Sequence, residues 1–146
     1  MSTSVQLLEK CLEIQQQRYR EARKKALQSE QSLNQQRDQL IYLQQAISNY
    51  RTDTNTQVTP ISVINLIRFR NLLQQVADLQ HRRVECGQEE YNRLSLQAAG
   101  EHRKLKAMEK LLEKMQQRKR MKLIKSEQKM LDDHAIRQYI DQRQDA

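Results

Sequence analysis

The stretch RTDTNTQVTP, residues 51–60, decides the fold because it is the one place in the 146-residue chain that disfavours a helix. Thr, Asp and Asn bond their own backbone in competition with helical hydrogen bonds, and Pro60, the only proline, lacks an N–H but suits the first turn of a helix. The flanking residues are mostly good helix formers. The sequence therefore predicts a first helix over about 4–51, a hinge over 52–60 and a second helix over about 61–141.

The composition excludes a thick globular core. Only 37% of the residues are hydrophobic and 4% aromatic, which is too little apolar side chain for such a core. Two alternatives remain: disorder, or a pair of helices joined by a narrow apolar seam. Disorder requires the apolar residues to lack periodicity. We therefore looked for periodicity within each predicted helix.

Apolar residues recur at alternating steps of three and four along both helices, as in a heptad repeat. In the first helix the positions are Val5, Leu8, Leu12, Gln15, Tyr19, Ala22, Ala26, Ser29, Leu33, Gln36, Leu40, Leu43, Ile47 and Tyr50. In the second they are Leu66, Phe69, Leu73, Val76, Gln80, Val84, Gly87, Tyr91, Leu94, Ala98, Glu101, Leu105, Met108, Leu112 and Met115. Two successive steps of four, at Val76 to Gln80 to Val84, predict a stutter. The fold class is all-α: a long antiparallel two-helix coiled-coil hairpin, with residues 1–146 as a single domain.

Folding the two seams about the hinge predicts the pairing between the helices. The numbers of facing residues then add up to 112 or 113, so that Ile47 meets Leu66 and Leu43 meets Phe69. The second helix is the longer one, and it should overhang the first over about 113–141. The heptad pattern fails at the same point.

Basic residues gather at the start of this overhang. The net charge of the chain is +8, and residues 101–125 carry ten basic side chains against three acidic ones. The densest group is Arg118, Lys119, Arg120, Lys122 and Lys125. A protein partner with an acidic surface accounts for it best. A solvated helix face with i,i+4 partners stays open as an alternative.

Nucleic acid and membranes suit this basic group less well. Residues 92–138 contain no Phe, Tyr or Trp for base stacking, and the cationic residues surround the segment instead of leaving one broad apolar face. Nucleic acid is therefore not expected as a partner.

An apolar band near the hinge is wider than the seam requires. It consists of Phe69, Leu72, Leu73, Val76 and Leu79. The band either packs entirely on the first helix or receives a partner helix through Leu72 and Leu79.

Signs of catalysis are missing from the sequence. The three histidines are scattered, the two glycines are isolated, and Cys11 and Cys86 lack CxxC spacing. We expect no enzyme activity, no catalytic residue, no cofactor, no metal and no small-molecule substrate. No basic start leading into an apolar run and no 18-residue apolar window occur, so we expect a cytoplasmic protein.

Two segments resemble the FliJ family of bacterial flagellar type III secretion. They are EHRKLKAMEKLLEK, residues 101–114, and EQKMLDD, residues 127–133. The resemblance implies a stalk that inserts into the hexameric export ATPase FliI, promotes its assembly and activity, and links it to the export gate protein FlhA and to substrate chaperones. It further implies a protein of flagellum biogenesis and motility, monomeric alone and located in the cytoplasm, peripherally at the inner-membrane export apparatus.

The resemblance also assigns site residues. The ATPase ring would meet Arg118, Lys119, Arg120, Lys122 and Lys125. The export gate would meet Phe69, Leu73, Val76 and Gln80. Phe69 and Leu73 match the family's stripe, whereas Val76 and Gln80 stand where a small apolar residue and, in some members, a histidine occur.

Three other functions fit the pattern. The first is the equivalent stalk of a virulence injectisome, which binds a different ATPase. The second is a basic coiled-coil protein that binds nucleic acid. The third is a structural spacer whose seams pair between two chains.

Overall fold

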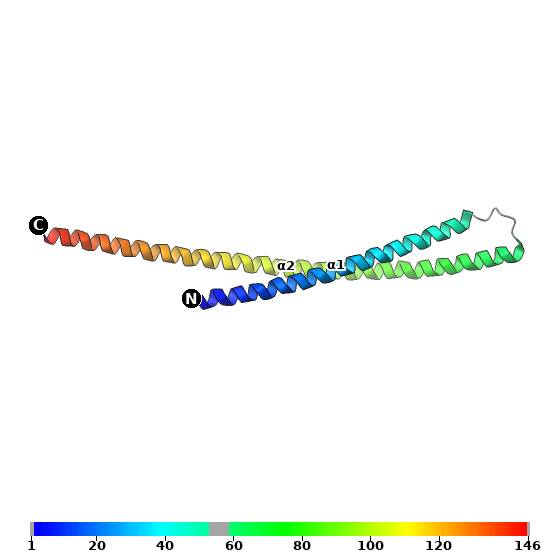
Figure 1. Cartoon of the computed structure of the whole chain (residues 1–146), viewed down its shortest axis with the longest axis horizontal. Helices are drawn as coiled ribbons and strands as arrows, with labels where there is room; N and C mark the ends of the chain where they lie inside the picture. The colour runs from blue at the N-terminus through cyan, green and yellow to red at the C-terminus, as the bar shows by residue number, and fades with distance from the viewer. Residues whose placement is uncertain (1, 53–58, 146) are drawn as a thin grey trace. The chain divides into compact units, whose positions relative to one another are not determined.

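The computed structural model describes residues 2–52 and 59–145, and this part of the chain consists of two α-helices. Helix α1 spans Ser2–Thr52 and helix α2 spans Pro60–Gln144 (Figure 1). No strand occurs among these residues. The predicted all-α helical hairpin is therefore confirmed. Most of the predicted hinge, residues 53–58, lies outside the described residues.

Thr59 caps the start of α2. Its hydroxyl Oγ1 accepts a hydrogen bond from the Ser62 backbone N–H at 3.4 Å, and its carbonyl accepts one from the Val63 N–H at 3.1 Å. Thr is a preferred N-cap residue, and proline is favoured at the first helical position because its missing N–H would be unpaired there. The Thr59-Pro60 pair therefore determines where α2 begins.

The chain divides into two compact units. One unit is Arg18–Glu101, in which α1 and α2 run antiparallel side by side (Figure 1). The other unit consists of Met1–Gln17 and His102–Ala146. Within this second unit, α2 continues past the start of α1. Each unit contains part of both helices, so its core is the seam between them.

The heptad phase of α1 is as predicted. Every one of the fourteen predicted seam positions is buried or half-buried, and Leu33 is the most enclosed apolar side chain with 2% of its surface exposed. Most positions between them are exposed. Alternation of three and four residues keeps one narrow face of a helix on its partner.

The seam of α2 differs from the prediction at two positions. Phe69 and Val76 are 43% and 42% exposed, while Ala77 is only 5% exposed and Arg70 is half-buried. With Arg70 and Ala77 in the seam, the steps alternate between three and four without a break as far as Met115. The predicted stutter is therefore wrong. Arginine can occupy such a position because its methylene stem packs while its guanidinium reaches water.

The register between the helices also differs from the prediction. Phe69 contacts Tyr50, with ring centroids 5.0 Å apart in an edge-on arrangement, and Gly87 lies against Leu33. The residue numbers of such pairs add up to about 120, a shift of about one heptad from the predicted pairing. The predicted contact of Phe69 with Leu43 is therefore wrong.

The shift has a physical reason. Registers that differ by seven residues bring equivalent heptad positions together, so the apolar pattern alone separates them poorly. The described side chains from Thr59 to Asn65 are all exposed, so α2 runs for about two turns before it meets the end of α1. The predicted pairing, which folds the two seams symmetrically about the hinge, is therefore wrong.

Polar contacts across the seam distinguish this register from its neighbours. The amide Nε2 of Gln80 donates to the Gln36 carbonyl at 2.9 Å and to Gln39 Oε1 at 3.2 Å, and Gln80 is only 5% exposed. Arg37 Nη2 also donates to Gln88 Oε1. Buried polar groups are costly without a partner, so a register that separates these residues is disfavoured.

Candidate partner-binding surfaces

The last part of α2 has no helix packed against it. We call residues 116–145 the unpaired segment, because every side chain in it is exposed, whereas Leu112 and Met115 are still half-buried. The overhang was predicted from about 113, and the shifted register explains why pairing continues slightly further. The segment exposes these large apolar side chains: Met121, Leu123, Ile124, Met130, Leu131, Ile136, Tyr139 and Ile140.

The apolar side chains of the unpaired segment point in several directions. Successive residues on an α-helix turn by about 100°, so Leu123 lies on nearly the opposite side of α2 from Met121, and Ile124 lies about 60° from Met121. Met130 and Leu131 are likewise adjacent in sequence and diverge. An ordinary amphipathic helix would place such residues on one stripe. This distribution suits a partner that contacts the helix from several sides.

Three of the predicted basic residues surround a hollow at the start of α1. Arg118, Lys119 and Lys122 line an open hollow of about 450 Å³ together with Val5 and Met115. Leu123, Ser126 and Ser4 complete it. The other two predicted residues, Arg120 and Lys125, are exposed on α2 outside the hollow. The hollow thus offers apolar contact surrounded by positive charge.

The five basic residues are available for a partner. Within the described part of the chain, none of them takes part in an ion pair. No acidic residue occurs between 118 and 125. Unbalanced charge of one sign attracts a partner of the opposite sign.

A second surface lies near the start of α2. Phe69, Leu72, Val76 and Leu79 are all exposed, and their spacing of three, four and three residues forms one stripe along the helix. We call these four residues the hinge-side stripe. Of the two alternatives left by the sequence, complete packing on α1 is excluded. The stripe is left open to a partner.

The other two residues expected at the export gate lie deeper. Leu73 is half-buried in the seam, and Gln80 is buried with both of its hydrogen bonds directed to α1. Gln80 forms the wall of a hollow of about 460 Å³ beside Tyr42 and Leu43. A partner at the hinge-side stripe would therefore touch Phe69 and Val76 first.

Over residues 2–52 and 59–145, two further kinds of site are absent. No group of three or more His, Cys, Asp or Glu side chains there is arranged to hold a metal ion. Neither helix, over the part described, is apolar for long enough to cross a bilayer. Cys11 and Cys86 are free thiols.

Two paired helices with an exposed basic end and an exposed apolar stripe are typical of a coiled-coil protein that binds other proteins. Comparison with known protein families identifies the family within this class. The model of the flagellar FliJ protein family matches residues 5–144, nearly the whole chain, and the protein belongs to that family. It is therefore a component of the flagellar type III export system. Searches of curated proteins and of solved structures found no match.

Proposed function

We propose that the protein acts as a stalk of the flagellar export ATPase. The unpaired segment enters the central pore of a hexameric FliI-like ring and favours the assembled, active hexamer. One observation carries this proposal. Residues 116–145 expose apolar side chains on several sides of one helix and carry a dense basic group at their start. A ring contacts an inserted helix from several sides, whereas a groove contacts only one.

Binding confined to the assembled ring would stabilise it. A ligand that binds one state and not another shifts the equilibrium by mass action. The stalk therefore needs no catalytic group of its own. Arg118, Lys119 and Lys122 would meet acidic groups at the pore entrance, with Lys125 on the same side of the helix as Arg118, and Arg120 on nearly the opposite side.

The hinge-side stripe is the proposed contact with the export gate. Phe69 and Val76 supply exposed apolar surface for an FlhA-like protein, and Leu73 contributes at its edge. We leave Gln80 out of this contact because it is buried and bonded to α1. Links to substrate chaperones and a peripheral location at the inner-membrane export apparatus, with the protein otherwise cytoplasmic and monomeric, complete the proposal.

The test is ATP hydrolysis by the purified cognate export ATPase, titrated with this protein while light scattering follows ring assembly. The intact chain should raise both signals to saturation. A chain ending at Met115 keeps every half-buried residue of α2, so it should fold normally and stimulate neither signal. Full stimulation by this shortened chain would overturn the proposal.

Charge reversal locates the contact. Replacing Arg118, Lys119 and Arg120 with Glu should abolish stimulation without loss of helicity. The matched control is Arg20→Glu, Arg23→Glu and Lys24→Glu, which changes the charge equally at exposed positions of α1 and should leave stimulation intact. Equal effects of the two triple variants would contradict a specific ring contact and indicate general electrostatic attraction. An injectisome ATPase in place of the flagellar one tests the alternative stalk assignment.

A further inference from the structure

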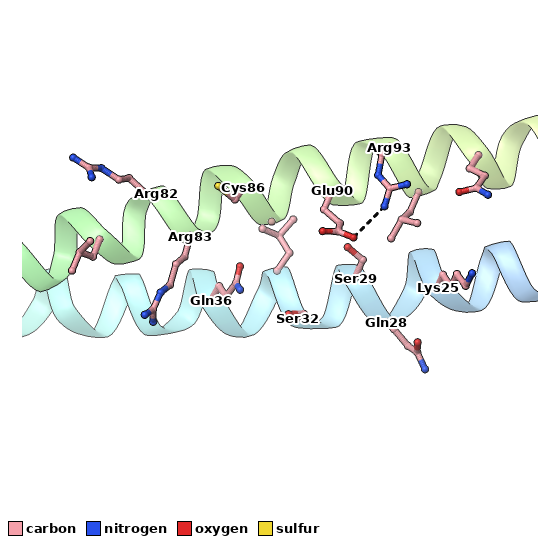
Figure 2. A pocket seen from close by; sticks show the side chains of 15 residues that line it. Lys25, Gln28, Ser29, Ser32, Gln36, Arg82, Arg83, Cys86, Glu90 and Arg93 are labelled. Carbon is pink, nitrogen blue, oxygen red and sulfur yellow. Dashed lines mark hydrogen bonds and ion pairs between the residues drawn. The ribbon is translucent and has the colours of Figure 1, made fainter.

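A groove runs between α1 and α2 within the Arg18–Glu101 unit (Figure 2). Its volume is about 960 Å³, and its sides come from both helices. Of the residues used above for the ATPase and the gate, Leu79 of the hinge-side stripe also lines this groove. Neither the unpaired segment nor Phe69, Leu73 and Val76 contribute to it.

Small residues create the groove. Ser29, Ser32 and Gly87 stand on its lining where heptad neighbours elsewhere carry larger side chains. The helices are close at Gly87, since a Cβ there would lie 2.6 Å from Gln36 Oε1 and 3.3 Å from Leu33 Cδ1. Gly87 therefore lets the helices approach closely, and the short side chains of Ser29 and Ser32 take up little space on the lining.

The groove combines apolar surface with positive charge. Leu33, Leu79 and Leu94 line it, and of these three Leu79, at 55% exposed, offers apolar surface to a partner. Its lining contains one carboxylate, that of Glu90. It contains four cationic residues: Lys25, Arg82, Arg83 and Arg93. In Figure 2 the Arg83 side chain extends from α2 towards α1, and Arg82 extends to the opposite side.

Most of this positive charge is uncompensated. Arg93 Nη2 pairs with Glu90 Oε1 at 3.3 Å. Lys25, Arg82 and Arg83 form no ion pair with any residue in the described ranges. Three cations without carboxylate partners beside an apolar surface match a ligand that is both acidic and apolar.

We propose that this groove binds an acidic amphipathic α-helix of a protein partner. From Leu79 to Leu94 the groove extends for about 22 Å, the length of about four helical turns. A helix of that length can place an apolar face on Leu79 and carboxylates beside the cations. Nucleic acid fits less well, because the lining contains no aromatic side chain on which a base could stack.

Cys86 supplies a readout at the site itself. It is exposed and lines the groove, whereas Cys11 does not. The probe is a synthetic helical peptide of three Leu/Glu heptads, compared with the same peptide carrying Gln in place of Glu. The Leu/Glu peptide should slow alkylation of Cys86 at least about tenfold and leave Cys11 unchanged. Equal protection by the Gln peptide, or none by either, would overturn the proposal.

Variants of the groove complete the test, with binding followed by fluorescence anisotropy of the labelled peptide. Lys25→Gln, Arg82→Gln and Arg83→Gln together should weaken binding at least about tenfold. The control Arg20→Gln, Arg23→Gln and Lys24→Gln should not. Ser32→Trp keeps the charge, fills an exposed position of the groove and should also block binding. Unchanged affinity in both groove variants, or competition by oligouridylate as strong as by the Leu/Glu peptide, would refute a groove for an acidic helix.

The two proposals fail separately. The chain ending at Met115 lacks the unpaired segment but keeps the whole groove. It should bind the acidic peptide as the full chain does, even though it does not stimulate the ATPase. Loss of peptide binding in this shortened chain would show that the groove is not the site.

Discussion

Two parts of α2 are both helical and both contain Leu, Ile and Met, yet they differ in what those side chains contact. Up to Met115 the apolar residues of the seam keep alternating steps of three and four and are packed against α1; beyond it, Leu131 is 69% exposed. Continuing the steps from Met115 leads to Lys119, Lys122 and Ser126. The phase of the apolar residues, and not their number, therefore separates the part of α2 that is paired within its own chain from the part whose side chains are exposed.

The largest expected effect comes from a matched pair of substitutions. Leu33→Ala removes the most enclosed apolar side chain and should lower the free energy of unfolding by about 2–4 kcal/mol. Leu131→Ala makes the same chemical change in the unpaired segment and should alter it by less than about 0.5 kcal/mol. Urea unfolding followed by circular dichroism measures both. Similar losses at the two positions would mean that the unpaired segment is packed in solution.

The buried glutamine gives the next effect. Gln80→Ala removes the amide that bonds to the Gln36 carbonyl and to Gln39 and should cost about 1–2 kcal/mol. Gln80→Leu should cost less than about 1 kcal/mol, because an apolar side chain suits the seam, but it should loosen the choice of register. Urea unfolding again measures the free energies.

The register of the Gln80→Leu variant can be measured directly. Spin labels are attached to cysteines introduced at Gln31 and Glu89, two exposed positions, in a chain whose own two cysteines are replaced by serine. With Gln80 retained, the labels should give a single distance. The variant should add a second population, because a slip of one heptad moves the labels about 10 Å along the axis. A single unchanged distance would show that other contacts, such as Arg37 with Gln88, suffice.

The two glycines give the smallest effect and test the close approach of the helices. A Cβ at Gly100 would meet nothing within 4 Å, so Gly100→Ala should raise stability by about 0.5–1 kcal/mol through helix propensity. Gly87→Ala has the same propensity gain, but its Cβ would displace Gln36 Oε1 and crowd Leu33. The net change there should be close to zero. Equal gains at both positions, measured by thermal unfolding, would mean that the helices stand further apart at Gly87.

Much of the fold was predictable from local chemistry. Pro60 predicted the start of α2, and the heptad steps of α1 predicted every buried position described in that helix. The choice of Phe69 over Arg70 was wrong because an apolar pattern cannot show that an arginine stem will pack. The register was wrong because pairings one heptad apart look alike in sequence, and only specific contacts such as that of Gln80 tell them apart.

The candidate sites were predictable to a lesser degree. The basic group of 118–125 stands out in the sequence, yet only the structure shows that Arg118, Lys119 and Lys122 share a hollow with Val5. The groove was missed because Lys25 and Arg83 are far apart in the sequence and can be placed on one groove only once the register is known. The small residues at Ser29, Ser32 and Gly87 were the available signal.

The unpaired segment has a consequence for the lifetime of the protein in a cell. A helix without tertiary contacts opens locally at little cost in free energy, and proteases cut backbone that has opened. Residues 116–145 are therefore where degradation of the free protein should begin, as limited proteolysis with and without a partner would show. A partner that encloses these residues protects them from proteases. The amount of intact protein would then follow the supply of its partner, with no dedicated regulator to match the two.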